Sequence, residues 1–364
     1  MISNEIEIVN FQNKLSKNFS LSKLLSEIGN PQNSIQVINI VGTNGKGSVS
    51  NALHQCLQKI YKNVGLFTSP SFLYHNERFK INNKYISDSE LNSILKEYDY
   101  LIRKYNLTFF EIFTLVTIIY FCAHKIDIAI IEAGIGGVLD STSVFKNQKL
   151  VVVTSISYDH QEILGKHIRS IINQKISIAN KGVPIYISAD NLKYRKYIQK
   201  NYEQTIFCEN SNTDLFYNNG NIGLVNRISK DLKISINPNE INRPIGRFTY
   251  IQRNPDIIID GCHNIDGIKK AIKSLPNKSF NFLFASSKNK NISYLKFLKK
   301  HCENLYICEF EHFKSWKIPD KIKKKSAFIY DWKKFLKENK DCNLFIFGSL
   351  YFIPYIYKYY KKST

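Results

Sequence analysis

The stretch from Val37 to Ser48 constrains the fold of this chain more than any other. It reads VINIVGTNGKGS, an apolar strand that runs into a glycine-rich turn and ends in lysine and serine, and the segment 49–61 after it has helical spacing of its apolar residues. Glycines let backbone N–H groups approach an anion, and the positive end of a helix favours negative charge. The stretch therefore predicts a phosphate cradle at the end of a strand.

Within this cradle, Lys46 can reach the β- and γ-phosphates of a nucleotide, and Ser48 can hold Mg²⁺. The spacing differs from the standard G-x-x-x-x-G-K-[ST], because Gly47 separates the lysine from the serine. A glycine-rich hairpin turn is the alternative, but it leaves the lysine and serine at a helix start unexplained. The predicted nucleotide-binding residues of this variant P-loop are Gly42, Thr43, Asn44, Gly45, Lys46, Gly47 and Ser48.

Strands alternate with helices along the rest of the chain, which predicts an α/β fold with a mostly parallel sheet. The alternation restarts at Arg247, and 364 residues are enough for two cores. We expect a domain over 1–245 that holds the P-loop, and a smaller α/β domain over 246–364. In the first we expect strands at 37–41, 126–132, 150–155 and 183–188, a short strand that runs into a loop at 64–70, helices at 88–104, 109–123 and 167–180, a polar connector at 76–82, and a connector with one small strand or helix at 203–245. In the second we expect strands at 256–260, 280–285, 304–308 and 343–347, and helices at 264–274, 292–303, 330–339 and 350–360.

The formal net charge is +21, and residues 247–364 hold 24 Lys and Arg against 10 Asp and Glu. Such an excess is compatible with a nucleic acid or a polyanionic small molecule as partner. It is also what a solvated surface has in a chain rich in Lys, Ile and Asn, and we favour this interpretation because the lysine runs lack interleaved aromatic residues.

Seven scattered cysteines without a C-x-x-C pair indicate a reducing compartment and argue against a disulfide framework and a zinc site. The first ten residues are polar and do not look like a secretory signal. The longest apolar run, 109–123, contains Glu111 and is shorter than the roughly twenty residues that span a bilayer. We expect a cytoplasmic protein without a membrane partner.

Several polar residues follow apolar strands, where ligands bind in such sheets. Glu132 ends one strand, and a carboxylate there suits Mg²⁺, although a solvated strand end is an equal alternative. Asp140 follows in a glycine-rich loop and could accept hydrogen bonds from a donor-rich heterocycle. His160 lies just past another strand of the same rim, where a lone histidine is more often structural.

Three further candidates are weaker when each is taken alone. Lys175 lies on a mixed helix, where a solvated lysine is the ordinary interpretation. Asp260 ends an apolar strand of the second domain and is followed by Gly-Cys-His-Asn, which repeats the strand-end pattern. Arg247, next to Gly246, is a cation near the boundary between the domains.

Taken in order, these stretches resemble the folylpolyglutamate synthase and dihydrofolate synthase family, a branch of the Mur ligase superfamily. The resemblance covers roughly residues 20 to 350. It is carried by Gly29-Asn30-Pro31-Gln32, the P-loop, Thr68-Ser69-Pro70 with Glu77-Arg78, Phe110-Glu111 with Thr114, Glu132 to Gly137 with Leu139-Asp140, Asp159-His160 with Leu164-Gly165, Lys175, Gly246-Arg247-Phe248, Asp260 with His263-Asn264, and Gly348-Ser349.

The resemblance implies an ATP-binding N-terminal domain, a smaller C-terminal α/β domain and a site in the cleft between them. Lys46 and the loop backbone would hold the phosphates, and Ser48 and Glu132 would hold one Mg²⁺ ion. His160 and Lys175 would hold a second, and the matching lysine of the family is typically carbamylated. Lys46, His160 and Lys175 would be the catalytic residues. The other implied contacts are Asn221, Arg247 and Asp260 for ATP, and Ser69, Phe110, Asp140, His263 and Ser349 for the substrates.

The implied activity is ATP-dependent ligation of L-glutamate to dihydropteroate or a folate through an acyl phosphate, by a monomer without a nucleic-acid partner. The chain departs from the family pattern at Ser71, Val138, Ser143 and Gln174, and its 190–245 connector is short. Three alternatives stay open. They are a catalytically weakened member of the family, a basic P-loop ATPase acting on nucleic acid, and a cell-wall Mur ligase, although only about forty residues precede the loop, too few for that class's additional domain.

Overall fold

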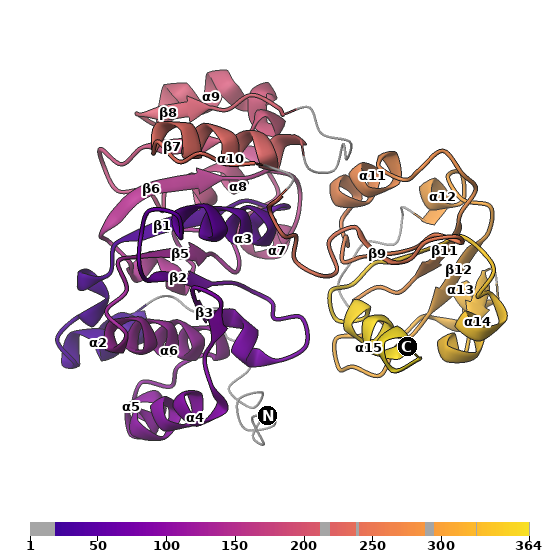
Figure 1. Ribbon diagram of the computed structural model, residues 1–364, viewed down its shortest axis with the longest axis horizontal. Helices are drawn as coiled ribbons and strands as arrows, with labels where there is room; N and C mark the ends of the chain where they lie inside the picture. Colours follow the sequence, from indigo (N-terminus) through magenta and orange to yellow (C-terminus); the bar gives the residue numbers. More distant parts are fainter. Residues whose placement is uncertain (1–18, 212–218, 238–239, 288–294, 325, 364) are drawn as a thin grey trace. The chain divides into compact units, whose positions relative to one another are not determined.

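The protein is described by a computed structural model, and the structure describes residues 19–211, 219–237, 240–287, 295–324 and 326–363. The chain divides between Arg243 and Pro244 into two compact units. Each unit is built on its own sheet, of eight strands in the first and six in the second (Figure 1). The expected α/β architecture with mostly parallel sheets is confirmed.

The first sheet has the strand order β4-β3-β2-β5-β1-β6-β7-β8. From β2 to β8 all neighbouring strands pair in parallel, whereas β3 and β4 form an antiparallel edge. The strand that leads into the P-loop, β1, therefore lies inside the sheet, between β5 and β6. The strands are β1 (Val37–Val41), β2 (Val64–Phe67), β3 (Phe79–Ile81), β4 (Lys84–Tyr85), β5 (Ile128–Glu132), β6 (Gln148–Val153), β7 (Ile185–Ile187) and β8 (Thr205–Phe207).

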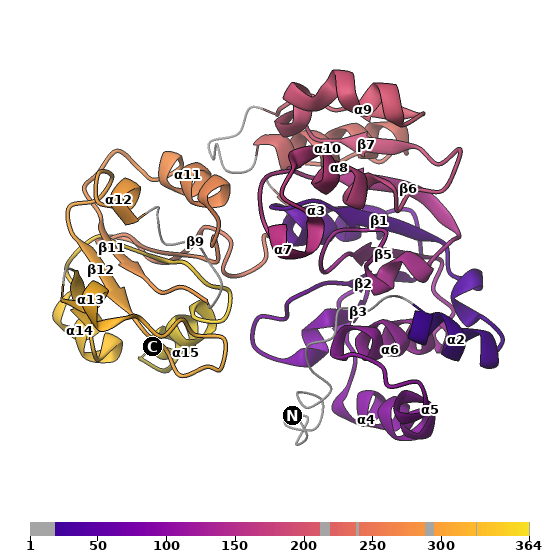
Figure 2. The same cartoon turned by 180° about the vertical axis from the view of Figure 1, so that it is seen from behind.

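Helices cover both faces of this sheet (Figures 1 and 2). Alternate strand residues point to opposite faces, so Ile128 and Ile130 pack with α3 and α10, whereas Ala129 and Ile131 pack with α6. Continuous apolar strands are expected where both faces are buried. The helices are α2 (Phe19–Glu27), α3 (Lys46–Leu57), α4 (Asp88–Glu97), α5 (Asp99–Lys104), α6 (Phe109–Ala123), α7 (Gln161–Leu164), α8 (Ile168–Ile176), α9 (Arg195–Asn201) and α10 (Asn219–Asp231), with short 3₁₀ turns η1 (Pro31–Ser34), η2 (His75–Arg78), η3 (Ser141–Val144) and η4 (Ala189–Tyr194).

The second sheet has the order β13-β12-β11-β14-β10-β9, with only β9 antiparallel to its neighbour. Phenylalanines dominate its core, where Phe282, Phe345 and Phe347 make ring contacts across β11 and β14. The elements are β9 (Thr249–Gln252), β10 (Ile257–Asp260), α11 (Ile265–Lys273), β11 (Asn281–Phe284), α12 (Leu295–Leu298), β12 (Leu305–Cys308), α13 (Asp320–Lys323), β13 (Ala327–Ile329), α14 (Trp332–Glu338), β14 (Leu344–Phe347) and α15 (Ile353–Ser363).

The expected connector 76–82 is wrong, and the connector 203–245 holds more than the one small strand or helix that we expected. The polar segment 76–82 contains η2 and β3, which pairs with β2 and β4 in the antiparallel part of the sheet, where only one face needs to be apolar. The segment 203–245 contains both β8 and the thirteen-residue helix α10, whose inner face is buried against α3. Helix propensity did not predict α10, because its start is rich in asparagine and glycine and both residues are poor helix formers.

In the part of the chain that the structure describes, no helix combines the length and the apolar character needed to cross a bilayer. The expected helix 109–123 is confirmed as α6, and a capping box of Thr108 and Glu111 fixes its first turn. A capping box of Ser87 and Glu90 opens the expected helix 88–104, which the structure breaks into α4 and α5.

Candidate active site

The P-loop connects β1 to α3 through two glycines with positive φ. At Gly42, with φ +146°, a Cβ atom would lie 1.8 Å from Oγ1 of Thr154. Gly45, with φ +93°, is the N-terminal capping residue of α3, and a Cβ atom there would lie 2.3 Å from Oδ1 of Asn221. Both positions therefore require glycine for conformation and for space. Asn221 is thus packed directly against the start of α3.

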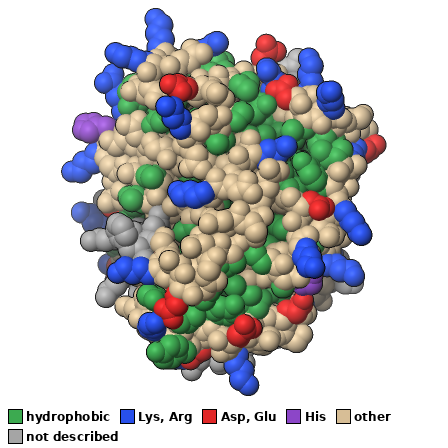
Figure 3. All heavy atoms as spheres, turned by 90° about the vertical axis from the view of Figure 1, so that its left-hand side faces the viewer, with side chains coloured by type: hydrophobic (Ala, Val, Ile, Leu, Met, Phe, Trp, Pro, Cys, Tyr) green, Lys and Arg blue, Asp and Glu red, His purple; other side chains and the backbone are tan. Residues whose placement is uncertain are grey.

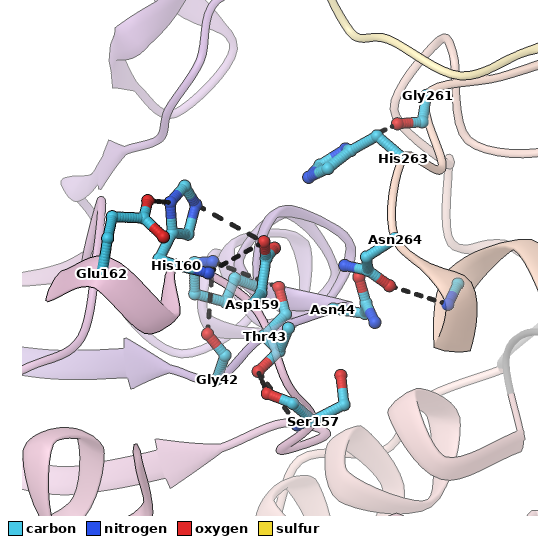
Figure 4. Close-up of polar contacts among 12 residues, drawn as sticks. Gly42, Thr43, Asn44, Ser157, Asp159, His160, Glu162, Gly261, His263 and Asn264 are labelled. Carbon is cyan, nitrogen blue, oxygen red and sulfur yellow. Dashed lines mark hydrogen bonds and ion pairs between the residues drawn. The ribbon is translucent and has the colours of Figure 1, made fainter. Parts of the chain in front are cut away.

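Hydrogen bonds fasten the loop to the segment that follows β6. Thr43 donates its backbone N–H to the Ser155 carbonyl at 2.6 Å, and its Oγ1 exchanges hydrogen bonds of 3.1 Å with the backbone of Ser157 (Figure 4). The backbone N–H of Asn44 donates to Oγ of Ser155 at 3.3 Å. This segment is held in turn by the buried Asn191, which bonds the carbonyl of Thr154 and the N–H of Ile156. The loop is therefore fixed in shape, as a phosphate cradle must be.

Two lysines converge on the carbonyl oxygen of Gly42. Lys46, the first residue of α3, donates to the carbonyls of Gly42 and Thr43 at 3.4 Å each. Lys175 is buried on α8 and donates to the Gly42 carbonyl at 2.7 Å. Burial and the charge of Lys46 lower the pKa of Lys175 to about 7. A substantial fraction of this amine is therefore neutral at neutral pH.

Glu132 is buried at the carboxyl end of β5, next to β1. Its Oε2 accepts a hydrogen bond of 3.2 Å from the backbone N–H of Ser69, in the loop after β2. The predicted substrate-binding residue Ser69 and the predicted metal ligand Glu132 thus lie together at one edge of the sheet, as expected for parallel strands.

His160 begins α7 in a left-handed conformation, with φ +48°. Its ring lies between two carboxylates, with Nδ1 3.7 Å from Oε1 of Glu162 and Nε2 3.9 Å from Oδ2 of Asp159, as Figure 4 shows. Asn, Asp and His are the residues most often found at positive φ without a glycine, and here the conformation turns the ring between its acidic neighbours.

The glycine-rich loop after β5 packs between α6 and α8. A Cβ atom at Gly134 would meet the Phe110 ring at 2.7 Å, and one at Gly137 would meet the carbonyls of Lys175 and Gln174 at 2.6 and 2.7 Å. The predicted substrate-binding ring of Phe110 therefore lies over this loop. The glycines allow the close approach that places Lys175 beside the P-loop.

Hydrogen bonds to Asp140 fix the shape of the same loop. It is buried, and its carboxylate accepts hydrogen bonds from the backbone N–H of Ile135 at 2.8 Å and from the N–H and Oγ1 of Thr142 at 3.0 and 2.6 Å. Burial raises the pKa of this carboxyl, and the hydrogen bonds oppose the rise. The geometry supports a positioning role for Asp140.

Asp260 ends β10 in the second unit and is fully buried. Its two oxygens accept hydrogen bonds of 2.6 Å from the backbone N–H groups of Phe248 and Cys262. Burial raises the pKa of Asp260, and the neighbouring charge of Arg247 opposes this rise. The predicted pair Arg247 and Asp260 is therefore brought together at the carboxyl end of this sheet.

Two more predicted residues lie at the same edge of the second sheet. His263 uses Nδ1 for a 2.9 Å hydrogen bond with the carbonyl of Gly261. Ser349 follows β14 and is buried, with its Oγ 2.7 Å from Oγ of Ser287.

Two of the predicted metal ligands fit Mg²⁺ by their chemistry, since Ser48 and Glu132 supply hydroxyl and carboxylate oxygens. The imidazole of His160 is a less usual ligand of this cation. The buried Oγ of Ser157, beside the loop, has no hydrogen-bond partner among the described residues. Among the described residues no group of three or more His, Cys, Asp or Glu side chains forms a cage for a metal ion. Mg²⁺ usually takes one or two carboxylates together with phosphates and waters, so such a cage is not required.

Sequence reasoning missed two residues that shape the P-loop, Ser155 after the neighbouring strand β6 and Asn191 in the turn η4 after β7. The Thr-Ser pair after the apolar strand β6 was a signal for Ser155, since polar residues at a strand's carboxyl end commonly face the ligand. No local signal marks Asn191, because its contacts are more than thirty residues away.

Comparisons with known proteins agree with this geometry. The family described as Mur ligase middle domain matches residues 40–236, more than half of the chain. The dihydrofolate synthase/folylpolyglutamate synthase of Bacillus subtilis (strain 168) is 26% identical over 405 residues, or 94% of each protein. That of Buchnera aphidicola subsp. Schizaphis graminum is 30% identical over 289 residues, which are 70% of this chain and 68% of the relative.

Among solved structures, E. coli FolC in complex with DHPP and ADP superimposes with a TM-score of 0.86 at 20% identity, over 98% of this chain and 97% of that one. The P-loop, the parallel sheet and the matching domain place the chain in the class of Mur ligases. Within that class it belongs to the folylpolyglutamate synthase and dihydrofolate synthase family.

Proposed function

We propose that this protein is an ATP-dependent ligase that joins L-glutamate to dihydropteroate, to a folate, or to both. The observation that carries the proposal is the convergence of Lys46 and Lys175 on the Gly42 carbonyl of the variant P-loop. It supports phosphoryl transfer, because it places the cation of Lys46 and the proposed metal ligand Lys175 beside the loop, where the charge of ATP must be neutralised. The relatives are named for these two synthase activities.

In the proposed reaction, an oxygen of the acceptor's carboxylate attacks the γ-phosphorus of ATP, which gives an acyl phosphate and ADP. The amine of glutamate then attacks the acyl carbon, phosphate leaves and a proton is released, so that an amide forms. Lys46 and the N–H groups at the start of α3 orient the phosphates and neutralise their charge. The fixed shape of the loop means that these donors need no reorganisation.

The metal ligands of this proposal are Ser48 and Glu132 for one Mg²⁺ ion, and His160 and Lys175 for a second. Bound Mg²⁺ would supply positive charge at the phosphates. The near-neutral pKa of Lys175 supports its carbamylation, since only the neutral amine reacts with CO₂, and the product is a carboxylate that suits a hard cation.

In the second unit we propose that Arg247 and Asp260 contact ATP and that His263 and Ser349 contact a substrate. Asn221 is the proposed contact to the nucleotide base, supported by its place at the start of α3. Ser69, Phe110 and Asp140 are the proposed pterin-side residues. The functional domains would be residues 1–245 and 246–364, in a cytoplasmic monomer.

A nucleic-acid partner is not part of the proposal. On the face that Figure 3 shows, Lys and Arg side chains are scattered among other residues and do not gather into one band, as is ordinary for a solvated surface. ATP hydrolysis that DNA stimulates in a salt-sensitive manner would contradict this view.

The test is ADP release with ATP and glutamate, first with dihydropteroate and then with tetrahydrofolate as acceptor. We expect glutamate-dependent release with at least one acceptor, and mass spectrometry should show the acceptor one glutamate residue heavier. ATP binding without ADP release in either reaction would refute the proposed function and support a catalytically weakened protein.

A further inference from the structure

A cationic and aromatic cluster lies beyond the carboxyl ends of β12 and β14 in the second unit. We call His312, Phe313, Lys314 and Tyr351 the Lys314 cluster. Nζ of Lys314 donates a 2.6 Å hydrogen bond to the hydroxyl of Tyr351 and lies 4.4 Å from the centre of that ring. The His312 ring stacks on both Tyr351 and Phe313, with centroids 4.8 and 4.6 Å apart.

The chain that carries this cluster is held in place from several sides. Ser315 pairs with Ser287 in an isolated β-bridge, and the N–H of Trp316 donates to the Ser286 carbonyl at 3.0 Å. The hydroxyl of Tyr355, on α15, donates to the Glu311 carbonyl at 2.5 Å. Because the segment is fixed on both sides of Lys314, the position of the ammonium group is largely set before any ligand arrives.

Lys314 has no acidic partner among the residues that the structure describes. Two neighbouring lysines do, since Lys317 and Lys323 lie 3.1 and 2.9 Å from the carboxylate of Glu309. Lys314 as a residue is also partly buried, whereas the Lys317 side chain is 76% exposed. A partly buried cation whose described neighbours are the phenol of Tyr351 and the ring of Phe313, without a carboxylate, is an attractive position for an anion.

The hydrogen-bond donors of the cluster point to the same conclusion. One N–H of the Lys314 ammonium is used by Tyr351, which leaves two. The Tyr351 oxygen accepts that bond, so its own hydrogen can be donated elsewhere. The two groups offer adjacent donors, which suit the two oxygens of one carboxylate.

We propose that Lys314 and Tyr351 bind a carboxylate of the incoming glutamate and thereby determine specificity for an acidic amino acid. This inference rests on the proposed function. The cluster adjoins the predicted substrate residue Ser349, because the Tyr351 N–H donates to Oγ of Ser349 at 3.1 Å. Ser349 in turn contacts Ser287. The hydroxyls of these two serines and the Lys314–Tyr351 pair therefore form one continuous row of polar groups.

The test is a set of steady-state measurements on Lys314→Met, Lys314→Arg and Tyr351→Phe, with Lys317→Met as the control for loss of a lysine from the same loop. Lys314→Met should raise KM for glutamate by about 10- to 100-fold, the usual effect of losing a hydrogen bond to a charged group. KM for ATP and for the acceptor should stay within about twofold. Lys314→Arg should restore part of the loss, and Tyr351→Phe, which keeps the ring stack, should raise KM for glutamate less than Lys314→Met does.

Glutamine and glutamic acid α-amide serve as competing amines and show which carboxylate is bound. Wild-type protein should prefer glutamate to both, and Lys314→Met should discriminate less against one of them. An unchanged KM for glutamate, or a rise in KM for ATP or the acceptor alone, would overturn the assignment.

If the wild-type protein releases no ADP with any acceptor, the proposed function fails. The glutamate site is then measured by calorimetry on wild-type protein and Lys314→Met. Weaker glutamate binding by the variant supports the site, whereas equal affinity, or no binding by either protein, overturns it.

Discussion

The ammonium of Lys175 lies 2.7 Å from the carbonyl oxygen of Gly42, although 133 residues separate them in sequence. This contact joins α8 to the P-loop and brings a buried amine to the place where phosphates are expected. A solvated lysine, the ordinary interpretation of its sequence context, is therefore wrong, since the side chain is only 3% exposed.

The role of Lys175 can be separated from packing by Lys175→Met, which keeps most of the buried side-chain volume. A buried ammonium costs desolvation energy, so its removal should change the free energy of unfolding little or increase it. Glutamate-dependent ADP release should fall at least about 100-fold, as expected for an electrostatic group at the transferring phosphate. The exposed Lys181→Ala should keep full activity. A large loss of stability with activity retained by the remaining folded protein would show that Lys175 is structural.

Lys46→Ala should abolish ligation because the helix start would lose the cation that reaches the phosphates. We expect a fall in kcat of about 10²- to 10³-fold or more, with circular dichroism unchanged. Lys62→Ala, an exposed lysine beyond the end of α3, is the matched control. Near wild-type turnover in Lys46→Ala would contradict the assignment of this loop as the phosphate-binding loop.

Much of the fold could be predicted from the sequence, because strands buried on both faces are short apolar runs with clear ends. The α6 helix and the strand β1 match their expected bounds. The strand β3 and the helix α10 were missed for a physical reason, since the strand is partly polar and the helix begins with poor helix formers.

The site was harder to predict than the fold. The P-loop is local, so its glycines and lysine could be recognised directly. Asn191 and Lys314 act through partners far away in sequence, and no local pattern sets them apart from other asparagines and lysines. The role of a single residue in this protein therefore depends on which side chains the edges of the sheets bring together.

Gly42 should tolerate no side chain. Gly42→Ala combines a strained φ with a Cβ atom 1.8 Å from Oγ1 of Thr154, whereas Gly182→Ala, at φ +83°, meets nothing within 4 Å. Urea unfolding should show a loss of about 1–2 kcal/mol for Gly182→Ala from backbone strain and about 1–3 kcal/mol more for Gly42→Ala from overpacking. Adding Thr154→Ala should recover part of that extra loss, and equal losses for the two glycine variants would contradict the tight packing of the loop.

His54 should make the first unit sensitive to acid. This buried histidine shares one hydrogen bond with the Val64 carbonyl through Nε2 and another with Nε2 of Gln58 through Nδ1. The neutral ring satisfies both, because Nε2–H donates to the carbonyl and Nδ1 accepts from the amide. Protonation would place the new Nδ1–H group opposite the amide N–H of Gln58, which is also a donor. Burial, with the charge of Lys80, lowers the pKa of His54 to about 4.

In the unfolded chain this residue becomes protonated near pH 6.5, whereas in the folded protein the ring stays neutral until about pH 4. The contribution to stability is therefore complete above about pH 6.5 and is lost as the pH falls to 4. From pH 7 to 4 the wild-type protein should lose about 2–3 kcal/mol more than His54→Gln. His167→Gln, at an exposed histidine of the same unit, should follow the wild-type curve. Parallel stability curves for wild type and His54→Gln would refute the neutral, buried imidazole.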